Sequence, residues 1–192
     1  RGIELAAAWQ ALAWLRADAN LTLSVNRIKD YTDYVQHVDT YDNWSETGKT
    51  TAMNYGTTTM LMSPSLTGMA RLSFKPWCHA SSSLKTMELS MDGKYVGKQY
   101  MDNTMTDSRS IPAYFVSNLA VSYSFPLSGS VGFAREDSVR ISFYVNNVFN
   151  NMYYADGWCW KNLIEEDGAV VDGIGVYPQA PINCMLKVSL RF

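Results

Sequence analysis

The sequence lacks the long apolar run that would form a membrane-spanning helix. No continuous apolar stretch reaches the roughly 18 residues that such a helix needs. Basic runs are also missing and the formal net charge is -2, so the phosphate attraction on which nucleic-acid binding depends is not expected. The chain is 47% hydrophobic, which excludes a disordered protein and predicts a folded one.

Reactive groups of the kind that enzymes bring together are scarce. His37 and His79 are the only histidines, and no Ser-His-Asp set, Gly-rich phosphate loop or zinc-ligand spacing is present. His37 with Asp39 and Asp42 offers one conceivable metal site, but a solvated loop is the favoured interpretation. The sequence therefore predicts a protein that is not an enzyme, with no catalytic, cofactor-binding or metal-ligating residue.

What the sequence does contain is a hydrophobic period of two. Residues 14–26 (WLRADANLTLSVN) alternate without a break between apolar side chains such as Leu21 and polar ones such as Thr22. The run is about twice the usual strand length of about 5 to 6 residues, and a strand that crosses a membrane needs about 9 to 11. Similar alternation recurs in residues 3–9, 69–75, 86–100, 113–125, 139–147 and 183–192. We expect about seven strands and no helix.

The alternation alone does not say which face of the sheet is inside. In a soluble sheet the apolar face packs on a core, whereas in an outer-membrane barrel it meets lipid. The connections favour the barrel, because short ones (residues 10–13, 76–83 and 126–137) alternate with long ones (residues 36–65, 101–112 and 151–181). Aromatic residues also gather at the expected strand ends, as in interfacial girdles: Trp9, Trp14, Trp77, Tyr95, Tyr100, Tyr153, Tyr154 and Trp158.

Several stretches resemble TonB-dependent outer-membrane receptors. RISFYVNNVFNNMYYADGW (residues 140–158) is similar to the penultimate strand of that family, with its N-N-hydrophobic-F-N motif and Tyr-rich loop start. The other matching stretches, in order, are residues 63–76, 93–104, 109–125 and 176–192, the last closest to Bacteroidetes-type receptors. The resemblance covers nearly the whole chain.

The resemblance implies an all-β fold, an antiparallel up-and-down meander that is part of a barrel of about 22 strands. Residues 1–192 would supply about the last seven strands. The chain starts RGIELAAAW, without a Met or a signal peptide, so we expect a piece of a longer protein whose plug domain and earlier strands are absent.

The implied function is TonB-dependent uptake of a scarce nutrient across the outer membrane. The implied partners are the TonB complex through the absent plug, the barrel assembly machinery through the C-terminal strand, outer-membrane lipid and a small-molecule ligand. The modest last loop, residues 150–181, favours an iron-siderophore or cobalamin over a glycan. Two alternatives remain open: a soluble all-β carbohydrate-binding module, and a porin-like barrel without energy coupling.

In this family the last strand ends on the periplasmic side, which assigns sides to the connections. His37 and His79 then lie on opposite sides of the membrane, while Cys159 and Cys184 lie towards the same side. A disulfide between these two cysteines stays open, because the long loop leaves their separation unconstrained, and Cys78 is expected to be free. The acidic residues Glu165, Glu166, Asp167 and Asp172 are expected in a solvated loop.

Charged residues that alternate with the apolar ones are expected to pair across strands or to contact the plug. These residues are Arg16, Asp18, Arg71, Lys75, Glu88 and Arg140. The residues that contact the transported ligand are not identifiable from the sequence.

Overall fold

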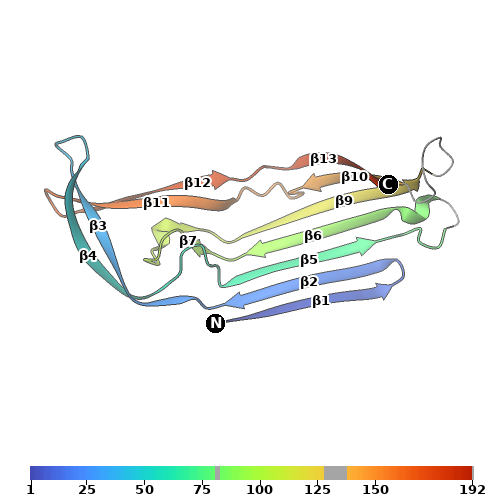
Figure 1. Cartoon of the computed structure of the whole chain (residues 1–192), viewed down its shortest axis with the longest axis horizontal. Coiled ribbons are helices and arrows are strands. Elements are labelled where there is room, and N and C mark those ends of the chain that lie inside the picture. Colours follow the sequence, from blue (N-terminus) through green and yellow to red (C-terminus); the bar gives the residue numbers. More distant parts are fainter. Residues whose placement is uncertain (81–82, 128–137, 192) are drawn as a thin grey trace.

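A computed structural model describes residues 1–80, 83–127 and 138–191, and its regular secondary structure is almost entirely β-strand (Figure 1). Seven strands lie side by side as one antiparallel sheet in the order β1-β2-β5-β6-β9-β10-β13. Their bounds are Gly2–Leu12, Leu15–Ser24, Leu66–Phe74, Glu88–Val96, Tyr114–Pro126, Ser138–Asn146 and Asn183–Arg191. Each strand pairs with the next sheet strand along the chain, which confirms the predicted up-and-down meander.

The other strands belong to the connections. β3, β4, β11 and β12 form a four-stranded sheet, and β7 and β8 form a small two-stranded one. These strands span Arg27–Asp39, Ser45–Thr59, Tyr154–Ile164, Val170–Pro178, Gln99–Tyr100 and Ser110–Ile111. The helical elements of the described chain are two short 3-10 turns, η1 (Ser83–Thr86) and η2 (Asp107–Arg109). Among the described residues, no helix is long and apolar enough to cross a membrane.

Long and short connections lie at opposite ends of the seven-stranded sheet. The β3–β4 and β11–β12 hairpins project from one end, called here the loop end, together with β7 and β8 (Figure 1). The turn between β1 and β2 and the described residues between β5 and β6 lie at the other end, the turn end, where β13 also finishes (Figure 1). His37 in β3 and His79 in the β5–β6 connection therefore occupy opposite ends, as predicted.

The sheet is a single layer with one apolar face and one polar face. Neighbouring strands place Leu5 beside Leu21, and Leu21 beside Gly68, so the apolar side chains of successive strands share a face. We call this face the apolar belt. Its large exposed residues are Ile3, Leu5, Trp9, Leu21, Leu23, Val25, Leu72, Phe74, Met91, Tyr95, Phe115, Leu119, Ile141, Phe143, Leu186, Val188 and Leu190.

No second sheet covers the apolar belt within the described chain. Leu21, Leu23 and Ile141 are 39%, 45% and 39% exposed, so they do not form the core that a soluble sandwich requires. The buried apolar residues gather instead towards the loop end: Val35, Val38, Val96, Met101, Ile111 and Val116. This arrangement argues against the soluble-module alternative.

The long connections were expected to be loops, and that expectation is wrong. Residues 36–65 contain the end of β3 and all of β4, and residues 151–181 contain β11 and β12. β4 is rich in Thr, which favours strands but gives no apolar alternation to detect. Trp158 was expected at a strand end, yet it lies within β11, where its indole covers Gly175 of β12 so closely that a Cβ there would clash.

We predict that this chain expressed alone in detergent-free buffer aggregates. The apolar belt exposes far more apolar area than the few hundred square ångströms that soluble monomers tolerate. The outer edges of β1 and β13 are unpaired in the described chain and invite pairing with other chains. Size-exclusion chromatography with light scattering checks this. A monodisperse monomer with cooperative melting would contradict it.

Candidate functional site

The polar face of the sheet carries a row of paired charges. Arg71 donates to Asp92 on the adjacent strand at 3.2 Å, and Asn118 donates to the same carboxylate at 2.9 Å. Arg16 and Asp18 pair within β2 at 2.7 Å. The strand register sets these side chains next to one another, because Asp18, Arg71, Asp92 and Asn118 occupy facing positions. The cross-strand pairing predicted from the sequence is confirmed for Arg71.

A second group of charges lies on the same face nearer the turn end. Glu88 of β6 approaches Lys75 at 3.6 Å and Arg140 of β10 at 3.9 Å, and Arg140 also donates to Ser122 at 2.7 Å. Cross-strand pairing is therefore confirmed for these residues too. Opposite charges across strands stabilise a sheet modestly, by about 0.2 to 1 kcal/mol per pair.

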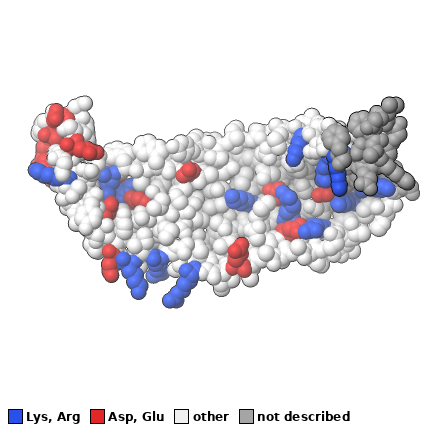
Figure 2. All heavy atoms as spheres, in the orientation of Figure 1, with Lys and Arg blue, Asp and Glu red and all other residues white. Residues whose placement is uncertain are grey.

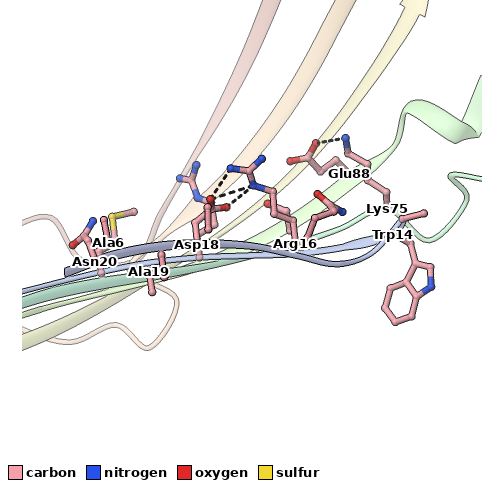
Figure 3. Close-up of a pocket in the computed structure, with 15 residues that line it drawn as sticks. Ala6, Trp14, Arg16, Asp18, Ala19, Asn20, Lys75 and Glu88 are labelled. Carbon is pink, nitrogen blue, oxygen red and sulfur yellow. Dashed lines mark hydrogen bonds and ion pairs between the residues drawn. The ribbon is translucent and has the colours of Figure 1, made fainter.

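Several of these charged residues line a hollow on the polar face (Figure 3), namely Arg16, Asp18, Arg71, Lys75 and Glu88. Its volume is about 970 Å³, and residues of β1, β2, β5 and β6 form its walls. Arg16, Asp18, Lys75 and Glu88 rise on one side of the sheet, whereas Trp14 points to the other side (Figure 3). The cations that line the hollow each pair with a carboxylate, so the hollow has a polar surface whose charges are balanced.

At the loop end, two hairpins far apart in the sequence join into one sheet. β3 and β11 pair in parallel, with Gln36, His37 and Val38 beside Asn162, Leu163 and Ile164. A backbone hydrogen bond from Glu165 to Val38 continues the contact at 2.9 Å. The β3–β4 and β11–β12 hairpins are therefore held together rather than being independent.

Arg109 is the most buried charge at the loop end. It follows β7, and its side chain is only 4% exposed. Its guanidinium donates to Asp102 at 2.6 Å, to Thr104 at 2.8 Å and to Asp172 of β12. It thereby ties the segment between β7 and β8 to the β11–β12 hairpin, and we call this set of contacts the Arg109 clasp.

The charge state of Asp102 agrees with its ion pair to Arg109. Burial alone would raise the pKa of Asp102, but hydrogen bonds from Thr104 and Arg109 lower it below its ordinary value. The carboxylate is therefore charged at neutral pH, as the ion pair with Arg109 requires.

Two further ion pairs link the hairpins. Lys161 of β11 donates to Asp33 of β3 at 2.5 Å and to the Tyr55 hydroxyl of β4 at 2.9 Å. Burial would lower the pKa of Lys161, but these two hydrogen bonds raise it above its ordinary value. Lys161 is therefore a permanent cation, and it holds strands from both hairpins.

The second link between the hairpins is centred on Glu165 and includes His37 of β3. His37 was expected in a solvated loop, and that expectation is wrong. Its Nδ1 lies 2.6 Å from Glu165, its Nε2 lies 2.7 Å from the Thr51 hydroxyl, and its side chain is 15% exposed. Lys49 also pairs with Glu165. Hydrogen bonds from Lys49 and from His37 lower the pKa of Glu165.

The conceivable metal partners of His37 are engaged elsewhere. Asp39 accepts hydrogen bonds from the backbone N–H groups of Tyr41 and Asp42, which form the turn of the β3–β4 hairpin. Across the described residues, no group of three or more His, Cys, Asp or Glu side chains could hold a metal ion.

The four acidic residues that were expected in a solvated loop differ in their surroundings. Glu165 and Asp172 are engaged in ion pairs, so the solvated-loop interpretation is wrong for them. Glu166 and Asp167 are exposed, although Glu166 accepts a hydrogen bond from the Thr40 backbone at 2.9 Å. Cys78, Cys159 and Cys184 are all free in the structure, without a disulfide between the last two.

Sequence reasoning did not single out Arg109, Asp102, Lys161 or Asp33 as interacting residues. Arg109 meets a partner 63 residues away and Lys161 meets one 128 residues away. No local spacing could have indicated such pairs. The described residues form a polar sheet face and a set of hairpins that ion pairs hold together.

Comparison with known proteins agrees with this architecture. The family model described as "TonB dependent receptor-like, beta-barrel" matches residues 1–148. A search of curated proteins finds no match. The siderophore receptor PiuA from Acinetobacter baumannii aligns over 97% of this chain with a TM-score of 0.64 and 14% identity.

The alignment with PiuA covers only 21% of that receptor, so the chain spans about a fifth of its length. The ferric preacinetobactin receptor BauA from the same organism aligns over 98% of this chain and 28% of its own, with a TM-score of 0.47 and 14% identity. At 14% identity, the alignment with PiuA shows a shared fold. With the family match over most of its residues, the chain belongs to the TonB-dependent receptor family and forms part of its β-barrel.

Proposed function

We propose that residues 1–192 form the C-terminal part of an outer-membrane receptor that takes up a scarce nutrient by TonB-dependent transport. The observation that carries the proposal is the family match combined with a one-layer sheet. One face of that sheet is an exposed apolar belt, and the other is a wall of paired charges. This division suits a barrel wall that lies between lipid and a polar interior.

The proposed partners follow from the same placement. The apolar belt contacts outer-membrane lipid, and β13 with its alternating apolar residues serves as the signal for the barrel assembly machinery. TonB acts through a plug domain outside this chain. The loop end faces the exterior and the turn end faces the periplasm. The β3–β4 and β11–β12 hairpins and the segment held by the Arg109 clasp then surround the entrance. The protein acts in transport rather than catalysis.

The proposed cargo is an iron-siderophore complex or cobalamin rather than a glycan. The last connection contains a single hairpin, β11–β12, which is modest for a receptor of large polymers. PiuA, which shares the fold, is described as a siderophore receptor, and this is in keeping with the proposal.

Uptake by the organism that carries the gene tests the proposal. A deletion strain and the parent strain are supplied with labelled ferric siderophores, labelled cobalamin and a labelled oligosaccharide. We expect the deletion to abolish uptake of one of the first two, and an uncoupler of the proton-motive force to do the same in the parent. Uptake that survives the uncoupler would favour a porin-like channel. Loss of oligosaccharide uptake alone would contradict the proposed cargo.

A further inference from the structure

The apolar belt ends abruptly at a group of basic residues. Among the described residues of the seven strands, the side chains on the apolar belt include no Lys, Arg, Asp or Glu. Beyond the loop end of β2, the same alternation brings Arg27 and Lys29 to that face, and Arg1 lies beside Val25 on the neighbouring strand. We call Arg1, Arg27 and Lys29 the basic edge.

Arg27 lies between Arg1 and Lys29. Arg1 and Val25 exchange backbone hydrogen bonds of 2.7 and 3.0 Å, so Arg27, two residues further on, is a diagonal neighbour of Arg1. Diagonal neighbours in a sheet are about 7 to 8 Å apart, and Lys29 follows Arg27 by about 6.6 Å along the strand. Figure 2 shows several basic side chains and an adjacent acidic one along the lower edge of the molecule, on the side of the N-terminus.

The basic edge lacks protein partners in the part of the chain that the structure describes. The side chains of all three residues are exposed and make no ion pair or side-chain hydrogen bond there. Asp30 follows Lys29 in the sequence, but it forms no ion pair with any residue of the basic edge. By contrast, Arg16, Arg71 and Arg140 on the polar face each have a carboxylate partner. Three cations beside a single carboxylate leave a net positive charge, and an anion supplied from outside would offset it.

The position of the basic edge identifies the kind of anion. Ten residue steps from Leu15 to Val25 at about 3.3 Å each cover about 33 Å along the strand. A strand tilt of about 40° reduces this to about 25 Å, the usual height of the apolar band of a barrel. Arg27 therefore lies where the hydrocarbon ends and head groups begin, within reach of lipid phosphates.

We propose that the basic edge binds the phosphate groups of membrane lipids whose acyl chains lie against Ile3, Leu23 and Val25. Arg and Lys make charge-assisted hydrogen bonds to phosphate oxygens, and the apolar belt directly below supplies contact for the chains. The inference rests on the proposed function, because it requires the belt to lie in a membrane.

The test uses the intact receptor in detergent, titrated with phosphatidylglycerol and, separately, with phosphatidylcholine. Native mass spectrometry counts the bound lipids. Each cation near an anionic lipid contributes a factor of about five in affinity. We therefore expect the double variant Arg27→Gln/Lys29→Gln to bind phosphatidylglycerol roughly 25-fold more weakly, with little change for phosphatidylcholine.

A matched control removes the same charge from the polar face. Lys94→Gln/Lys187→Gln also deletes two exposed cations, and we expect its lipid affinity to equal that of the wild type. Electrophoretic mobility with and without heating shows whether each variant is folded. Equal weakening in both double variants, or none in the first, would overturn the proposal.

Two further outcomes separate the possibilities. Displacement of phosphatidylglycerol by inorganic phosphate alone would show a site for free anions and would overturn the lipid assignment. If the receptor inserts into lipid and imports its cargo but shows no preference for phosphatidylglycerol, this inference fails while the proposed function stands. Failure to insert into lipid at all would overturn the proposed function itself.

Discussion

Replacing Arg109 with methionine is expected to open the loop end of the molecule. The side chain is 4% exposed and is the shared partner of Asp102 and Asp172, so its loss leaves two partly buried carboxylates without their cation. Removing one member of a buried ion pair costs about 3 to 5 kcal/mol. Both carboxylates retain some exposure, so we expect about 3 kcal/mol of local opening free energy to be lost.

Amide hydrogen exchange of the intact receptor measures this loss. We expect faster exchange in the segment from β7 to β8 and in β12, with no change in the seven-stranded sheet. Lys98→Met is the matched control, because Lys98 lies in the same connection and pairs with Asp107 at 2.5 Å. That pair is on the surface, where Asp107 is 81% exposed, so we expect little effect. Equal effects of the two substitutions would contradict the structural role of the Arg109 clasp.

The second large effect is expected on the apolar belt. Leu21 lies near the middle of β2 and is 39% exposed, whereas its neighbour Thr22 lies on the polar face. An arginine on the lipid face at the bilayer midplane costs about 2 to 4 kcal/mol, and one facing the interior costs much less. We therefore expect Leu21→Arg to impair insertion of the full-length receptor and Thr22→Arg to leave it nearly intact.

Surface display of the receptor in cells measures insertion for both variants. β13 provides an independent repeat, with Val188→Arg expected to be harmful and Ser189→Arg tolerated. Val188→Leu controls for a simple change of side-chain size and should be tolerated as well. Equal display of the Leu21 and Thr22 variants, or the reverse order, would mean that the apolar belt does not face lipid.

The sequence by itself determined the seven strands of the main sheet, their order and their two faces. Alternation such as that of Leu21, Thr22 and Leu23 indicates a strand with one apolar and one polar face, because successive side chains of a strand point to opposite faces. The pairing of Arg71 and of Glu88 with oppositely charged neighbours followed from the same regularity. Each of these features depends on residues that are adjacent in a strand or in facing positions on neighbouring strands of a meander.

The loop end was decided only by the tertiary structure. β4 is rich in polar residues and β12 has glycines between its apolar residues, so the apolar period that marks the strands of the main sheet is weak in both. The parallel pairing of β3 and β11 joins His37 to Leu163 across more than a hundred residues. Arg109, Lys161 and Glu165 then find partners on other hairpins, which turns what was expected to be solvated loop into a fixed assembly. Contacts of this kind depend on how whole hairpins are placed in space, and the spacing of residues along the sequence does not predict that placement.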